Sequence, residues 1–281
     1  MSDQNKNILR VSDLVLGVKD DEGEGFRFLI EYGSFEINEG DFVLIKGRNG
    51  SGKSTFLRLF HLQGMRYFRF VRGSICFCHQ DFPNKSIKDY TSEELTHLNC
   101  AVSYIGQEER FLSSDSAYSY IYNTCKIALD YDKSMTPAEK KERLCLVDGI
   151  IYDYYEKYLS SSFLCKSYKV FKSKSVRSWS GGQQKMISVL AGIIKARVCS
   201  LKLVVMDEPL NNLDGRNKDI LNKLITDLRR ERVSIIAITH CQVFDGVNKV
   251  MSIEECEDGV HRATLFARNE PAHTECLEPF N

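Results

Sequence analysis

The chain has 281 residues, enough for a well-buried core, and its length suits one large domain or a domain with a subdomain. Its 38 Lys and Arg residues balance 38 Asp and Glu residues, so no overall field favours nucleic acid or an anionic membrane surface, and we expect no direct nucleic-acid partner. No stretch approaches the roughly 18 apolar residues of a membrane span, and the N-terminus carries no apolar secretory segment. We therefore expect a cytoplasmic protein whose ten cysteines are free thiols.

The first part of the chain predicts short strands separated by turns. Strands are expected, in chain order, at residues 8–16, 26–37, 42–45, 74–78 and 101–105. A helix is expected from Lys53 to about Gly64, and a second helix around residues 92–98. Gly106 and Gln107 follow directly after the last of these strands.

An eight-residue loop of the form G-x-x-x-x-G-K-[ST] joins the strand at 42–45 to the helix from Lys53. It comprises Gly47, Arg48, Asn49, Gly50, Ser51, Gly52, Lys53 and Ser54, and Thr55 follows it. Its glycines permit backbone conformations in which successive N–H groups turn inward toward a phosphate. Lys53 can reach the β- and γ-phosphates, and the Ser54 hydroxyl can ligate Mg²⁺. We interpret the loop as a nucleoside triphosphate site rather than as a glycine-rich turn without a ligand.

The segment from residue 108 to residue 179 differs in character from what precedes it. Apolar residues take helical spacing, and Thr136-Pro137-Ala138-Glu139 is typical of a helix start with proline in the first turn. Tyrosines crowd at positions 118, 120, 122, 152, 154, 155 and 158. We predict a mostly helical subdomain whose aromatic residues are more often core than binding surface. The polar stretches 160–162 and 172–178 are expected to be loops.

The remaining part of the chain predicts a second set of alternating helices and strands. A helix is expected from Gln183 to about Lys195, and the apolar runs 203–206 and 234–239 are typical of strands buried on both faces of a parallel sheet. A loop at 210–214 precedes an amphipathic helix that continues to Arg232. A β-like stretch from Val247 leads into a polar tail that we expect to be mobile.

Four of the expected buried strands end in residues suited to phosphate chemistry, and ligands of such sheets lie beyond the carboxyl ends of the strands. These ends carry the phosphate loop, Gln107, Asp207-Glu208 and His240. Asp207 is placed to hold Mg²⁺, and Glu208 to orient or deprotonate an attacking water. An Asp-Glu pair alone is equally typical of a solvated loop, so the functional interpretation depends on the phosphate loop.

Ser180-Gly181-Gly182 lies at an expected helix N-terminus, where bare N–H groups and the helix dipole favour a second phosphate contact. Two such features separated by a helical subdomain suggest that two chains share one nucleotide.

The order of these motifs over residues 8–261 resembles the ATP-binding cassette (ABC) ATPase family. The spacings agree: 54 residues from Lys53 to Gln107, 73 from Gln107 to Ser180 and 33 from Asp207 to His240. The resemblance implies an α/β fold: a RecA-like P-loop ATPase core (1–107 and 180–261) with an N-terminal antiparallel β-subdomain, an inserted helical subdomain (108–179) and a C-terminal tail (262–281).

The resemblance also implies ATP and Mg²⁺ as cofactors, and roles for the residues that match the motifs. ATP would lie between the phosphate loop of one protomer and Ser180, Gly181, Gly182 and Gln183 of the other. Gln107, with Ser54 and Asp207, would meet the metal. Asp214 would communicate across the dimer, and His240 would position the γ-phosphate and the water. The catalytic set is Glu208, His240, Lys53 and Gln107.

Three departures from the family pattern affect finer assignments. Trp179 stands where the family usually has leucine, and Met186 where an arginine is common. The adenine-stacking aromatic residue is either Phe26 or Phe28, and an acidic insertion near residues 20–25 leaves the choice open.

The resulting functional hypothesis is the ATPase subunit of an ABC transporter, which dimerises head-to-tail around two ATP molecules and drives a separate membrane permease. It would be peripheral at the cytoplasmic face of the membrane. The alternatives are a soluble ABC ATPase without a transport role, and a regulatory module that binds nucleotide without hydrolysing it. The filled positions Glu208 and His240 disfavour the regulatory module. The sequence leaves open which substrate is transported, whether transport is import or export, and whether the dimer is homo- or heteromeric.

One cysteine group could also suggest a metal. Cys76, Cys78 and His79 lie close together, with His61 and Cys100 elsewhere in the chain. No second pair of ligands completes a tetrahedral site, so we interpret these cysteines as small buried hydrophobic residues.

Overall fold

The computed structural model describes residues 7–19, 25–60, 68–78, 80–82, 91, 102–107, 111–160, 167–239 and 244–268. None of the described helices is long and apolar enough to cross a membrane. The six cysteines in the described part are free thiols.

A ten-stranded sheet runs through the molecule in the order β5-β4-β1-β2-β10-β9-β3-β8-β7-β6. Its strands are β1 Asn7–Lys19, β2 Phe26–Asn38, β3 Phe42–Gly47, β4 Phe68–Phe77, β5 Gln80–Phe82, β6 Val102–Ile105, β7 Leu203–Asp207, β8 Ser234–Ile238, β9 Lys249–Glu255 and β10 His261–Ala267. Strands β9, β3, β8, β7 and β6 pair in parallel, whereas β1 pairs antiparallel with β2 and β4. The predicted α/β fold, with a parallel core and an antiparallel N-terminal sheet, is confirmed.

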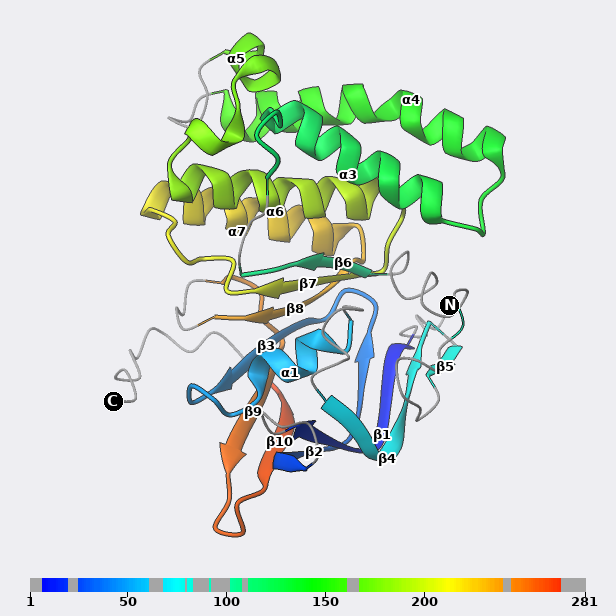
Figure 1. Cartoon of the computed structure of the whole chain (residues 1–281), viewed down its shortest axis with the longest axis vertical. Helices are drawn as coiled ribbons and strands as arrows, with labels where there is room; N and C mark the ends of the chain where they lie inside the picture. Colours follow the sequence, from blue (N-terminus) through cyan, green and yellow to red (C-terminus); the bar gives the residue numbers. More distant parts are fainter. Residues whose placement is uncertain are drawn as a thin grey trace.

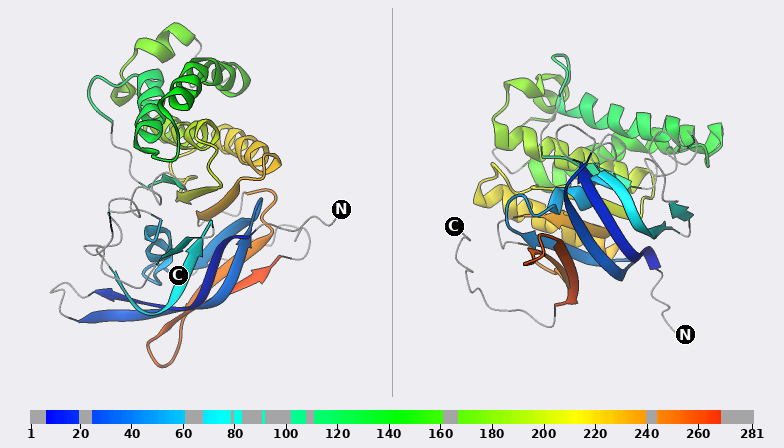
Figure 2. Two further views of the ribbon diagram at one scale, coloured as in Figure 1. Left: turned by 90° about the vertical axis from the view of Figure 1, so that its right-hand side faces the viewer. Right: turned by 60° about the horizontal axis from the view of Figure 1, so that its bottom comes forward.

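Both faces of the parallel strands are covered, which explains their continuous apolar sequences. All five residues of β7 and of β8 are buried. Alternate residues of each strand contribute to two different hydrophobic clusters, one under the helices and one shared with the antiparallel strands. In both views of Figure 2 the green helices lie together at one end of the molecule and the blue strands at the other.

The helices are α1 Lys53–Arg58, α3 Ala117–Tyr131, α4 Pro137–Tyr154, the π-helical turn η3 Tyr155–Leu159, α5 Tyr168–Ser173, the 3₁₀ turn η4 Val176–Ser178, α6 Gly181–Val198 and α7 Gly215–Arg230. Helices α6 and α7 lie over β6–β8, and α3 and α4 lie beyond them (Figure 1). The expected helix start at Thr136 is confirmed: its hydroxyl accepts a hydrogen bond from the Glu139 amide, and Glu139 bonds back to the Thr136 amide.

Helix α7 shows why an amphipathic sequence gives a one-sided helix. Its buried residues recur three and four positions apart along one face, which packs against α6 and β8: Ile220, Leu221, Leu224, Ile225 and Leu228. At its C-terminal end, Asp227 accepts hydrogen bonds from Lys157, at 2.5 Å, and from the Tyr158 hydroxyl of the π-helical turn. These contacts join the segment after α4 to the helix that follows the 210–214 loop.

The structure corrects two expectations about regular elements. The polar stretch 172–178 was expected to be a loop, but α5 extends to Ser173 and η4 covers Val176–Ser178, because Phe171 and Val176 are buried in the helical core. The C-terminal tail was expected from residue 262, but β10 continues to Ala267 because it pairs with β9 along its whole length. The expected helix at 92–98 and the expected end of the first helix near Gly64 lie outside the described residues, as does most of the tail.

The tyrosines of the helical segment divide between core and surface. Tyr154, Tyr155 and Tyr158 are buried, whereas Tyr152 is exposed. Tyr118 and Tyr122 are half-buried and stack on each other with ring centroids 5.9 Å apart. Most of these aromatic side chains therefore contribute to packing, as the sequence interpretation favoured.

Candidate functional site

The phosphate loop has glycine where the backbone requires it. Gly47 ends β3 beside β9, and a Cβ at this position would lie 2.6 Å from the Ile253 carbonyl oxygen. Gly50 and Gly52 have φ angles of +83° and +92°, in the left-handed region that side chains disfavour. The loop conformation therefore depends on three of the eight motif residues.

Lys53 lies within this loop. Its ammonium donates hydrogen bonds of 2.8 Å to the carbonyl oxygens of Gly47 and of Arg48. Burial lowers the pKa of Lys53, and the nearby carboxylates of Glu208 and Asp207 oppose that shift. The ammonium thus lies between the loop backbone and the two carboxylates at the end of β7.

Ser54 and Asp207 meet although they are about 150 positions apart in the chain. The Asp207 carboxylate accepts a hydrogen bond from the Ser54 hydroxyl. Burial raises the pKa of Asp207, whereas this bond and the cations Arg58, Lys185 and Lys53 act in the other direction. Asp207 Oδ1 is buried and has no hydrogen-bond partner among the described residues. A hydroxyl beside a carboxylate with an unpartnered oxygen is a donor set that suits Mg²⁺.

Glu208 follows Asp207 in an unusual backbone conformation. Its φ angle is +51°, and its amide donates a 3.1 Å hydrogen bond to the Ile238 carbonyl at the end of β8. The side chain is only 6% exposed. A non-glycine residue in this region is held there at a cost of about 1–3 kcal/mol, which is typical of residues at functional sites.

Gln107 is exposed, just beyond the end of β6. Its backbone carbonyl accepts a 3.1 Å hydrogen bond from the ammonium of Lys185, a residue of α6. His240, the predicted residue at the end of β8, lies outside the described residues.

Ser180 caps the N-terminus of α6. Its hydroxyl accepts a hydrogen bond from the Gln183 amide, and the Gln183 side chain accepts one from the Ser180 amide. Ser180 and Gly181 are exposed. A Cβ on Gly182 would lie 2.5 Å from the Asn212 carbonyl oxygen, so α6 begins directly against the loop that leads to Asp214. Asp214 in turn caps α7 through the Asn217 amide, at 2.8 Å.

We expect Gly182→Ala to destabilise the protomer by about 1–3 kcal/mol, the usual cost of overpacking, because the new methyl group must displace the backbone at Asn212. Gly181→Ala is the matched control, since a Cβ there meets nothing within 4 Å. It should leave stability unchanged or raise it slightly, because alanine is the better helix former. Scanning calorimetry without nucleotide measures both, and equal melting temperatures would contradict the close contact.

Phe26, one of the two candidate adenine-stacking residues, is 45% exposed. Its ring lies over Gly17 of the neighbouring strand, where a Cβ would come within 2.3 Å of a ring carbon. Gly17 therefore makes room for an aromatic face that is open to solvent. The side chain of Phe28 lies outside the described part of the structure.

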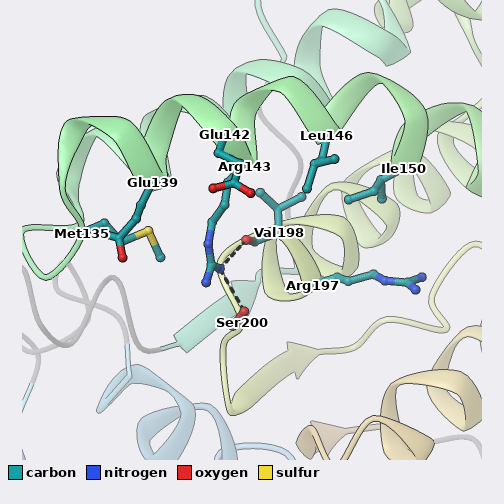
Figure 3. A pocket seen from close by; sticks show the side chains of 9 residues that line it. All are labelled: Met135, Glu139, Glu142, Arg143, Leu146, Ile150, Arg197, Val198 and Ser200. Carbon is teal, nitrogen blue, oxygen red and sulfur yellow. Dashed lines mark hydrogen bonds between the residues drawn. The ribbon is translucent and has the colours of Figure 1, made fainter.

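A groove of about 510 Å³ lies elsewhere, between α4 and the C-terminal end of α6 (Figure 3). Arg143 crosses it and donates to the Val198 carbonyl at 2.7 Å and to the Ser200 hydroxyl at 2.9 Å. Since the 18 residues of α6 span about 27 Å, the groove is distant from the Ser180 cap and is not part of the nucleotide site.

Only Cys76 and Cys78 of the cysteine and histidine group lie among the described residues. No cluster of three potential ligands from His, Cys, Asp and Glu occurs among the described residues. Cys76 and Cys78 are half-buried, and His79 lies outside that part of the chain.

The fold thus brings together one set of predicted site residues and leaves another apart. Lys53, Ser54, Asp207 and Glu208 form a single cluster, and the Ser180 turn contacts the loop before Asp214. The Ser180 turn bonds to Gln183 of its own helix and lies against Asn212 in the loop before Asp214. The sequence interpretation missed Lys185, because a lysine one turn into a helix is usually solvent-exposed.

A phosphate loop on a parallel sheet, with carboxylates at the end of β7, the second strand along from the loop strand β3, defines a P-loop nucleoside triphosphatase. The family model described as ABC transporter matches residues 31–211. The chain belongs to this family and is an ATP-binding cassette ATPase.

Individual relatives agree with this assignment. An ABC transporter ATP-binding protein of Clostridium acetobutylicum is 24% identical over 234 residues, which cover 83% of this chain and 80% of that protein. The xylose import ATP-binding protein XylG of Photobacterium profundum is 26% identical, and the match covers 84% of this chain but only 40% of XylG. Among solved structures, a dimeric bacterial ABC transporter cassette matches with a TM-score of 0.63 at 16% identity, over 94% of this chain and all of that chain.

Proposed function

We propose that this chain is the ATP-hydrolysing subunit of an ABC transporter and that it works as a head-to-tail dimer around two ATP molecules. The observation that carries the dimer is the exposed Ser180-Gly181 turn at the start of α6. Its amides are suited to phosphate, yet no described contact brings it to the phosphate loop of its own protomer. In the dimer, the Ser180-Gly181 turn of a second protomer supplies these amides to the nucleotide bound at the phosphate loop.

Within one site, Lys53 and the loop amides bind the phosphates, and Ser54 and Asp207 would hold Mg²⁺ together with Gln107. The metal would supply positive charge that neutralises the phosphates. Glu208 accepts a proton from the attacking water, and His240 positions the γ-phosphate. Asp214 lies at the start of α7, close to the turn that meets the partner, and is suited to communicate across the dimer.

The proposed transport role is inferred from the names of the relatives, which are ATP-binding proteins of transporters. In this role the chain would act at the cytoplasmic face of a membrane through a separate permease. The helical segment 108–179 offers exposed apolar side chains for this contact: Leu112 is 69% exposed and Tyr152 is 46% exposed.

Site-specific photo-cross-linking in membranes of cells that express the chain tests this proposal. A photoreactive residue at Leu112 or Tyr152 should give adducts with an integral protein of several membrane spans. Phe266 on β10 is the matched control, because it is 48% exposed and lies outside the helical segment. Permease adducts from position 266 alone would refute the docking site. Adducts with non-membrane proteins alone would favour the soluble ABC ATPase.

A further inference from the structure

Helix α6 packs unusually closely on β6, the edge strand of the parallel sheet (Figure 1). A Cβ on Gly192 would lie 2.4 Å from a side-chain carbon of Ile105, so only glycine permits this approach. The Ser103 hydroxyl donates to the Gly192 carbonyl at 2.7 Å, and Lys195 donates to the Val102 carbonyl at 3.2 Å. The strand and the helix therefore form one unit along the whole of β6.

Lys185 extends this unit beyond the end of the strand. Its ammonium donates to the carbonyl oxygens of Gly106 and Gln107, at 2.8 and 3.1 Å. The residue is 2% exposed. A buried ammonium is unfavourable unless hydrogen bonds and opposite charge compensate it, so these two contacts fix both the lysine and the backbone that it holds.

The position of Lys185 links two predicted parts of the ATP site. It lies five residues after Ser180, about 7.5 Å along the same helix, and it donates a hydrogen bond to the backbone carbonyl of Gln107. A rigid helix transmits any movement of the Ser180 turn to Gln107 through this contact.

We propose that Lys185 is a positioning residue for ATP hydrolysis, which holds the Gln107 backbone to the helix that carries Ser180. It acts by positioning Gln107, and its positive charge also favours the ionised form of Asp207. The inference rests on the proposed function of Gln107 and names the residue that places it. Since a group misplaced by about 1 Å can cost up to about 100-fold in rate, losing this contact should slow turnover more than it weakens ATP binding.

Lys185→Met tests the proposal, because methionine fills the buried space with an unbranched chain but donates no hydrogen bond. We expect kcat for ATP hydrolysis by the purified chain to fall about 10- to 100-fold, with KM for ATP changed less than about threefold. Lys195→Met is the matched control: it removes an ammonium that also donates from α6 to a β6 carbonyl, but near the other end of the strand. Its kcat should stay within about twofold of the wild-type value.

A double-mutant cycle with Gln107→Ala separates positioning from general stability. In the Gln107→Ala background, Lys185→Met should cost less than about threefold in kcat, because the group that it positions is already gone. If the losses of kcat caused by Lys185→Met and Gln107→Ala are fully additive, the inference is wrong. It is also wrong if Lys195→Met lowers kcat as much as Lys185→Met does. If Gln107→Ala itself leaves kcat unchanged, the role of Gln107 and the role of Lys185 both fail. If Gln107→Ala lowers kcat but Lys185→Met leaves it unchanged, the role of Gln107 is supported and only the inference about Lys185 is wrong.

Discussion

Lys53→Ala should abolish measurable ATP binding. In the structure the Lys53 ammonium lies 2.8 Å from two carbonyl oxygens of the phosphate loop, beside the carboxylates of Asp207 and Glu208. A polyphosphate at this loop would exchange these contacts for charge-assisted hydrogen bonds to two phosphate groups. At about 1.5–3 kcal/mol each, two such bonds correspond to a loss of roughly 10²- to 10⁴-fold in affinity.

Isothermal titration calorimetry with ATP and Mg²⁺ measures this loss. Lys202→Ala is the matched control, since it also removes one ammonium, but from the amino end of β7, where Lys202 pairs with Glu39 at 3.2 Å. Its ATP affinity should equal that of the wild-type chain. An unchanged dissociation constant for Lys53→Ala would show that the loop is not the phosphate site.

The parts of the structure that the sequence predicted well depend on local patterns. The phosphate loop requires glycine at positions 47, 50 and 52, and all three have φ angles that side chains disfavour. Strands β7 and β8 could be recognised because burial on both faces gives each a run of four apolar residues, at 203–206 and 235–238. The helix start at Thr136 could be predicted because its capping interactions involve only the four consecutive residues 136–139.

The parts that the sequence did not predict depend on contacts between distant residues. Lys185 is buried only because α6 packs against the end of β6, and no local pattern distinguishes it from an exposed lysine. The polar stretch before η4 becomes helical because Phe171 packs near Trp179, with ring centroids 6.5 Å apart. Strand β10 continues past residue 262 because β9 supplies its hydrogen-bond partners.

The two departures from the family pattern on either side of the Ser180 turn, Trp179 and Met186, have a common physical basis. Trp179 and Met186 are both buried in the hydrophobic cluster beneath the helices. The indole N–H of Trp179 is buried without a hydrogen-bond partner among the described residues, which costs about 1–3 kcal/mol. Burial of the large apolar surface of the Trp179 ring in the helical core offsets this cost.

Glu208→Gln should lower ATP turnover by roughly 10²- to 10⁴-fold, the scale of general-base catalysis, while ATP binding persists. The substitution keeps the shape of the side chain but removes its charge and basicity. The amide of residue 208 would still donate to the Ile238 carbonyl, so the strand end should keep its geometry. Lys53, Ser54 and the loop amides remain in place to bind the phosphates.

The same variant tests whether the site is shared. If each ATP joins the phosphate loop of one protomer to Ser180, Gly181 and Gly182 of the other, slowing hydrolysis should prolong the ATP-bound dimer. Sizing chromatography with ATP and Mg²⁺ should then show a dimer for Glu208→Gln. Adding Ser180→Arg should return it to a monomer, because a bulky cation fills the space before the exposed helix cap. A monomeric Glu208→Gln that hydrolyses ATP at the wild-type rate would show both assignments to be wrong: Glu208 would not be the base, and the Ser180 turn would not close the site.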